Sequence, residues 1–122
     1  MELQHQSVTE QILGAAFEVQ RVLGYGFLES VYQKAMQAEL IQRGLSAEIE
    51  QPIPVHYKSV KVGHFEADLL VERCVIVELK VASTYRPEDE SQLLNELKAT
   101  GIKVGLLINF GRTKVEFKRL VF

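Results

Sequence analysis

The segment formed by residues 75–81 constrains the fold of this chain more than any other stretch of its sequence. Five of its seven residues are aliphatic, which is typical of a strand buried between two layers. Glu78 and Lys80 interrupt the run two residues apart, so in a strand they share one face and the aliphatic residues at 75, 77, 79 and 81 share the other. Burying a carboxylate or an ammonium costs several kcal/mol unless each finds a partner. The segment therefore predicts a buried strand with a charged site on one face.

The preceding apolar segment, residues 65–71, supplies a second carboxylate, Asp68. It is close enough in sequence to pair with the buried strand as an antiparallel hairpin. Asp68 lies opposite Glu78 only if the loop is centred on Arg73, so we expect a loop of three or five residues there, or an equivalent bulge. A regular two-residue turn would place Asp68 opposite a valine, on the wrong face of the sheet.

Two interpretations of these charges follow from the spacing. Two carboxylates and a lysine at one spot of a buried sheet are how a protein holds a divalent cation beside a positioned water. The alternative is a half-exposed antiparallel sheet in which Lys80 neutralises Glu78, because Glu-x-Lys is a common string. The other motifs of the chain favour the metal site.

Composition restricts the class of protein. The chain has 122 residues, of which 47% are hydrophobic and 25% charged, so we expect one globular domain over residues 1–122. A single cysteine, Cys74, excludes an internal disulfide, and the sequence has neither a signal-like start nor an apolar run that could span a bilayer, so we expect a cytoplasmic protein without a membrane partner. The net charge is −2. Any nucleic-acid partner must therefore be held by a local patch and not by the overall field.

Periodicity predicts three helices and five strands. Apolar residues recur at helical spacing from Ser7 to Leu23 and from about Leu28 to Arg43, and Pro87 suits the first turn of a third helix that ends near Thr100. The predicted strands are residues 47–57, 60–71, 75–81, 104–110 and 115–121. The first three can form an antiparallel meander, and the third helix is a crossover that brings in the fourth strand parallel to the third. Helices then cover both faces, which gives an α/β/α arrangement.

Four short motifs together resemble a known family. They are Gly26-Phe27-Leu28-Glu29-Ser30-Val31-Tyr32, which is a GxxExxY string, then Ala67-Asp68, Glu78-Leu79-Lys80 and Gln92-Leu93-Leu94-Asn95. In this order and spacing they resemble the GxxExxY proteins, a branch of the PD-(D/E)XK nuclease-like superfamily. The resemblance covers nearly the whole chain. It implies a restriction-endonuclease-like, three-layer α/β/α fold with a five-stranded mixed sheet of order 12345, in which strands 2 and 5 are antiparallel to the rest.

The resemblance also implies roles for individual residues. Asp68 and Glu78 would be metal ligands, and Glu29, from the second helix, would complete the acidic cluster. Lys80 would orient or activate the attacking water and offset charge on the phosphate. Gln92 would contact the water or phosphate. Tyr32 lies one turn after Glu29, so its hydroxyl could reach the same region, although a tyrosine on an apolar helix face is more often part of the core. Oxygen ligands favour magnesium or manganese, and the expected substrate is DNA or RNA.

The expected function is therefore a metal-dependent nuclease that hydrolyses phosphodiester bonds. A chain this small can also form a homodimer to build a substrate channel. The alternative is an interaction module that keeps the fold and has lost turnover. The acidic pI favours the alternative, as does Glu96, which stands where relatives usually have an aromatic residue and could repel a phosphate backbone. The intact Asp68, Glu78 and Lys80 favour the enzyme, since a buried charge cluster with no task should drift towards apolar residues.

Overall fold

The computed structural model describes residues 4–122, and the predicted helices and strands are present in it. The helices are α1 (Gln6–Leu23), α2 (Glu29–Gln42) and α3 (Pro87–Thr100); the strands are β1 (Ala47–Tyr57), β2 (Val60–Val71), β3 (Val75–Lys80), β4 (Val104–Asn109) and β5 (Glu116–Val121). Within this described range no helix is both long enough and apolar enough to cross a membrane.

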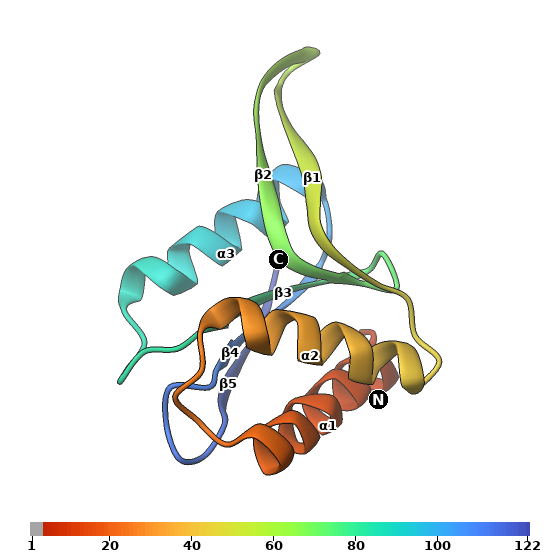
Figure 1. Ribbon diagram of the computed structural model, residues 1–122. Coiled ribbons are helices and arrows are strands. Elements are labelled where there is room, and N and C mark those ends of the chain that lie inside the picture. The colour runs from red at the N-terminus through yellow and green to blue at the C-terminus, as the bar shows by residue number, and fades with distance from the viewer. Residues whose placement is uncertain (1–3) are drawn as a thin grey trace.

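The strands form one mixed sheet in the order β1-β2-β3-β4-β5. β1, β2 and β3 make an antiparallel meander, and β3 pairs parallel to β4 because α3 connects them as a crossover. β5 returns antiparallel to β4 at the far edge (Figure 1). The parallel β3–β4 pair and the other strand directions are those that the sequence predicted.

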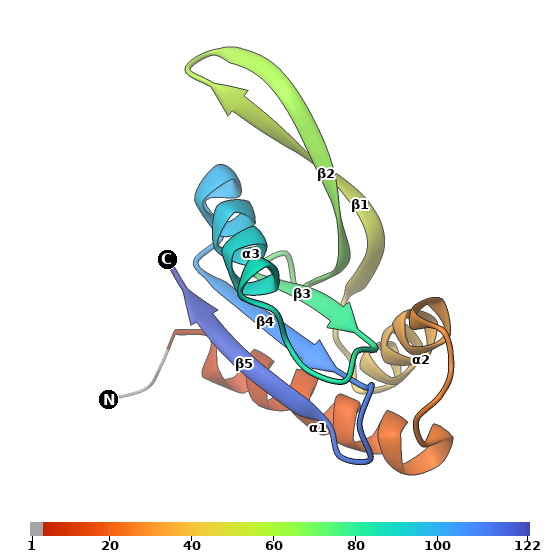
Figure 2. The same ribbon diagram turned by 90° about the vertical axis from the view of Figure 1, so that its left-hand side faces the viewer.

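Helices lie on both faces of the sheet, which separates the core into two parts (Figure 2). α1 and α2 cover one face, where they bury the aliphatic side chains of β3 at positions 75, 77 and 79. α3 covers the other face, where Leu93 and Leu97 pack on Ile76 and Leu107. Alternation along β3 therefore directs Glu78 and Lys80 towards α3, as its sequence pattern predicted.

The β2–β3 hairpin confirms the register that a shared site requires. Leu69 pairs with Val77 and Val71 with Val75, so the loop has three residues and is centred on Arg73. Glu72 and Arg73 both take left-handed backbone conformations, with φ of 51° and 53°. Continuing this register brings Asp68 opposite Glu78.

Two residues, Asn109 and Gly111, fix the chain where it leaves β3. Asn109, fully buried at the end of β4, accepts the backbone N–H of Ala82 at 3.0 Å and donates to the Ala82 carbonyl at 2.7 Å. Gly111 lies against the same backbone, because a Cβ there would come within 2.4 Å of Ala82. These contacts end β3 at Lys80 and β4 at Asn109, one residue earlier in each strand than the sequence indicated.

Candidate active site

Asp68 lies where β2 separates from β3. The ladder between these strands ends at the Leu69–Val77 pair, and beyond it β2 continues with β1 alone (Figure 2). Past this point the side chain of Asp68 takes the place of a backbone hydrogen bond between β2 and β3, since its Oδ2 accepts the backbone N–H of Leu79 at 2.8 Å. Its carbonyl accepts a hydrogen bond from Nε2 of Gln33 on α2 at 2.9 Å. The carboxylate is thus anchored to β3 beside Glu78.

Glu78 faces a second carboxyl group that comes from α3. Glu78 and Glu96 are 8% and 6% exposed, and their side chains interact directly. Burial raises the pKa of Glu78 to about 10, and its hydrogen bond with Glu96 and the charge of Asp68 act in the same direction. Burial also raises the pKa of Glu96, against the hydrogen bonds from Glu78 and Gln92, which lower it. Both shifts favour a protonated, neutral carboxyl group in this pair over two carboxylates.

This pair fits a cation. If both side chains are carboxylates, Oε1 of Glu78 and Oε1 of Glu96 are buried without a hydrogen-bond donor. Two like charges and two unpaired buried oxygens are costly, and either a shared proton or a bound cation removes that cost. Carboxylate oxygens suit hard divalent cations such as magnesium or manganese. The unpaired Oε1 of Glu78 is therefore an oxygen of the kind that a divalent metal binds, and the Asp68 carboxylate lies beside it.

Lys80 pairs with a carboxylate that the sequence did not single out. Its Nζ lies 3.7 Å from Oδ1 of Asp89, near the start of α3. The salt-bridge interpretation of the sequence had required Glu78 as the partner of Lys80. Asp89 is buried, and its Oδ2 also accepts the backbone N–H of Arg86 at 3.1 Å. A proline followed two residues later by an acid is typical of a helix start. This signal, Pro87 and Asp89, could have indicated that the Asp89 carboxylate lies at the start of α3, near the end of β3.

Glu29 lies near Asp68 but is not gathered with Glu78 into one cluster. Burial raises the pKa of Glu29, and the charge of Asp68 raises it further. Both residues line a cleft of about 280 Å³ with Ser30, Gln33, Glu50 and Glu66. Over residues 4–122, no three histidine, cysteine, aspartate or glutamate side chains are arranged to hold a metal ion. The expected metal-binding group of Asp68, Glu78 and Glu29 is therefore not formed among the described residues, although the charges of Asp68, Lys80 and Asp89 all act on Glu29.

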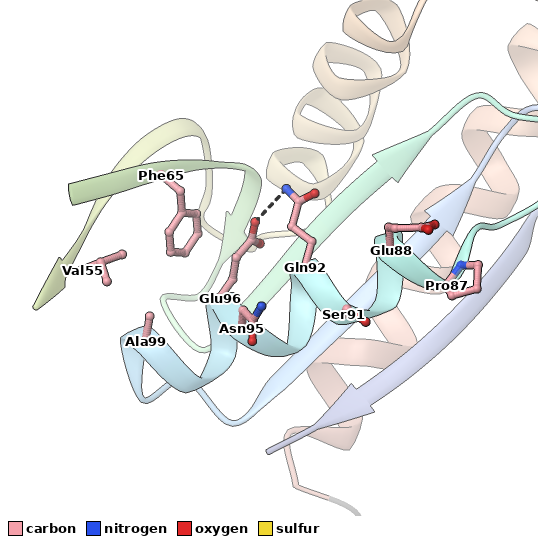
Figure 3. Close-up of a pocket in the computed structure, with 9 residues that line it drawn as sticks. All are labelled: Val55, Phe65, Pro87, Glu88, Ser91, Gln92, Asn95, Glu96 and Ala99. Carbon is pink, nitrogen blue, oxygen red and sulfur yellow. Dashed lines mark hydrogen bonds between the residues drawn. The ribbon is translucent and has the colours of Figure 1, made fainter. Parts of the chain in front are cut away.

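Gln92 lies beside Glu96 at the edge of a larger groove. Its Nε2 donates to Oε2 of Glu96 at 3.3 Å (Figure 3). The groove has a volume of about 640 Å³ and runs between α3 and the β1–β2 hairpin. Gln92 is thus placed between Glu96, which contacts Glu78, and the open groove.

Tyr32 lies in the core, which differs from the substrate contact expected from the sequence. Its side chain is fully buried, and its ring stacks on Phe110 with centroids 4.5 Å apart. Its hydroxyl donates to the carbonyl of Gly24 at 2.7 Å. The last Tyr of the GxxExxY string therefore holds the α1–α2 connection against the end of β4, and no part of it reaches solvent.

Comparison with known proteins agrees with this fold. The family model of the PD-(D/E)XK nuclease superfamily matches residues 6–120. The solved structure titled "Crystal structure of SSO0001" superposes with a TM-score of 0.58 at 14% sequence identity, which is a likeness of fold. That match covers 97% of this chain and 59% of the other, so this chain spans about three fifths of that protein's length. No curated protein matches the sequence. The family match extends over nearly all of the chain, which therefore belongs to the PD-(D/E)XK nuclease superfamily.

Proposed function

We propose that this protein is a divalent-metal-dependent nuclease that hydrolyses phosphodiester bonds of DNA or RNA. The observation that carries the proposal is the hydrogen bond from the Leu79 N–H to Oδ2 of Asp68, which holds this carboxylate beside Glu78, with Lys80 two residues further along the same strand. Superfamily membership supports it, because PD-(D/E)XK nucleases generally use divalent metals on nucleic acid. We further propose that the chain falls in the GxxExxY branch, on the strength of the string at residues 26–32.

In this proposal Asp68 and Glu78 hold the metal, and magnesium or manganese suits their oxygen atoms. When bound, such a cation supplies positive charge for the phosphate and makes a water molecule a usable nucleophile near neutral pH. Glu78 must give up its proton to become a ligand. Asp68 keeps its place during this change, because its Oδ2 is held by the Leu79 backbone. Glu29 adds negative charge at the rim of the site through its interaction with Asp68.

Lys80 and Gln92 act on the phosphate side of the site. The ammonium of Lys80 is held by Asp89 but remains partly exposed, so it can orient a water molecule and offset charge on the phosphate. The Gln92 side chain, which already donates to Glu96, can contact the water or a phosphate oxygen from the groove. Phosphodiester hydrolysis places extra negative charge on the phosphate oxygens, and these donors stabilise that charge.

A specific observation favours a second candidate function, an interaction module without turnover. Glu96 contacts Glu78 and shares its proton, which competes with a metal for the same carboxylate. An acid at this position also repels phosphate. If this competition prevails at physiological metal concentrations, the fold is retained and catalysis is lost.

Metal titration with a cleavage assay separates the two functions. The purified chain is titrated with magnesium and with manganese by calorimetry, and then incubated with labelled single-stranded and duplex DNA and RNA with each metal or with chelator. A nuclease cleaves at least one substrate with metal and none in chelator. Absence of both metal binding and cleavage would overturn the nuclease proposal and favour the interaction module. Light scattering under the same conditions tests whether the protein is a homodimer.

A further inference from the structure

The β1–β2 hairpin extends well beyond the sheet as a projecting arm (Figures 1 and 2). Only residues 69–71 of β2 pair with β3, whereas β1 and β2 pair with each other from Ala47–Val71 out to Tyr57–Val60. A long two-stranded ribbon with no third strand buries little apolar surface and gains little stability for the fold. Its length therefore needs another explanation, and its side chains supply one.

The tip of this arm is basic although the protein as a whole is acidic. Residues 55–65 contain two lysines and two histidines and no acidic residue, whereas the chain has a net charge of −2. Among residues 4–122, no carboxylate forms an ion pair with Lys58 or Lys61. Tyr57 is 65% exposed, and the ammonium of Lys58 lies 5.5 Å from the centre of its ring. The arm thus presents uncompensated positive charge beside an exposed aromatic ring.

The groove at the base of the arm has the opposite character. Val55 and Phe65 form its wall on the arm side, with the ring of Phe65 facing α3 (Figure 3). The α3 wall carries two amides, Gln92 and Asn95, and it also carries carboxylates. Those carboxylates repel phosphate, while an aromatic ring and amides suit the flat face and polar edge of a nucleobase. The groove therefore favours bases, and the arm favours phosphates.

We propose that the arm (residues 55–65) and the groove bind single-stranded nucleic acid and lead it to the Asp68–Glu78 site. Lys58 and Lys61 contact the phosphates, Tyr57 stacks on one base, and an unstacked base enters the groove against Phe65. Gln92 lines the groove and contacts Glu96, so a strand lying in the groove ends beside Glu78. The direction of the strand rests on the proposed nuclease function; the binding itself does not.

The test is a binding measurement in chelator, where no metal-dependent cleavage can occur. Short fluorescently labelled single-stranded DNA, single-stranded RNA and duplex DNA are titrated with the full chain at low salt, and binding is followed by anisotropy. The arm variant Lys58→Glu/Lys61→Glu should bind a single strand roughly tenfold or more weakly and lose about 1.4 units of the log–log salt slope, which corresponds to two phosphate contacts. Tyr57→Ala should weaken binding by about fivefold or more without changing the slope.

The matched control is Lys34→Glu/Lys114→Glu, which changes the net charge equally at two exposed positions outside the arm. It should keep most of the parent's affinity, and thermal melts should show that all variants fold. The proposal is overturned if the control loses as much affinity as the arm variant, if the parent prefers duplex DNA, or if the parent binds no nucleic acid. A protein that binds through the arm but cleaves nothing in magnesium or manganese overturns the proposed nuclease function and supports this inference.

Discussion

The ammonium nitrogen of Lys80 lies 3.7 Å from Oδ1 of Asp89, so the last residue of β3 is tied to the first turn of α3. Asp89 is 7% exposed and also accepts the Arg86 N–H, whereas the Lys80 side chain keeps 29% of its surface exposed. Asp89 therefore positions the ammonium without enclosing it. Because Asp89 is the partner of Lys80, Glu78 is left without a counter-ion on its own strand, and its proton or a cation must neutralise it.

Replacing Lys80 with alanine should abolish cleavage and leave metal affinity nearly unchanged. Cleavage should fall on the order of a hundredfold or more, because the ammonium stabilises charge that develops on the phosphate. Metal binding should persist, since Lys80 is not one of the proposed ligands. The free energy of unfolding should fall by only about 1–3 kcal/mol, because Asp89 keeps its backbone hydrogen bond. Cleavage gels, calorimetry and thermal melts measure the three quantities.

Lys118→Ala is the matched control for this variant. Lys118, on β5, also pairs with a carboxylate of α3, that of Glu90, but both side chains of this pair are well exposed to solvent. Its loss should change neither cleavage nor stability by much, since exposed ion pairs contribute little. A well-folded Lys80→Ala protein with the activity of Lys118→Ala would rule out a catalytic role for Lys80.

Gly111→Ala should destabilise the fold because of the close approach between Gly111 and the segment after β3. A Cβ at this position would lie 2.4 Å from the backbone of Ala82, so the backbone must shift. We expect a loss of about 1–3 kcal/mol in the free energy of unfolding, measured by urea denaturation. Gly63→Ala is the control, because a Cβ there meets no atom within 4 Å. Equal stability of the two variants would show that the Ala82 contact is unimportant.

Much of the fold was predictable because local patterns determine it. The two prolines of β1 indicated an edge strand, and β1 is at the edge of the sheet. The even spacing of Asp68 and Glu78 predicted a loop of three or five residues, or a bulge, around Arg73, since a slip of one residue would move one charge to the opposite face. The loop has three residues. The alternation of side chains along a strand and the register of a hairpin depend on short segments, so both can be predicted from a single sequence.

The site was less predictable because its contacts join distant segments. Asp89 becomes the partner of Lys80 only when α3 packs across the end of β3. The spacing of the two residues in the sequence does not predict the distance between their side chains. Glu96 was recognised as a departure from the family, but its direct contact with Glu78 depends on the rotation of α3. Tyr32 illustrates the reverse case, since its position on an apolar helix face was compatible with both the core and the site.

Asp68→Asn should melt at a higher temperature than the parent protein when both are in chelator. Asparagine keeps an oxygen that can accept the Leu79 N–H, and it removes a charge that disfavours the ionised forms of both Glu78 and Glu29. Relief of about 1 kcal/mol would raise the melting temperature by roughly 3–5 °C in a domain of this size. Millimolar magnesium or manganese should then raise the melting temperature of the parent but not that of the variant.

Four thermal melts decide this point, parent and variant, each with chelator and with metal. The expected result is that the two proteins converge or cross when metal is added. If Asp68→Asn melts below the parent in chelator and neither protein responds to metal, Asp68 has only a structural role where β2 separates from β3. The interaction module would then be the better description of the protein.

The pH dependence of stability should reveal the proton on Glu78. Its pKa is raised from an ordinary glutamate value to about 10 in the folded protein, chiefly by burial, so the folded state binds this proton more tightly than the unfolded state does. The stabilisation is fully present below the unfolded pKa and is lost as the pH rises through the folded pKa. The raised pKa values of Glu29 and Glu96 act with the same sign. In chelator, the free energy of unfolding should therefore fall from pH 6 to pH 9, by up to about 1.4 kcal/mol per pH unit.

Glu78→Gln should remove most of that slope, because glutamine has no proton to lose and can still donate a hydrogen bond to Glu96. Glu72→Gln is the control. Hydrogen bonds from Ser46 lower the pKa of Glu72, so this residue affects stability only in acid and its replacement should leave the slope from pH 6 to pH 9 unchanged. Urea denaturation at several pH values measures all three proteins. A parent whose stability is flat over this range, or a Glu78→Gln protein with the parent's slope, would show that Glu78 is ionised in the folded protein. The buried pair with Glu96 would then have to be neutralised by another group.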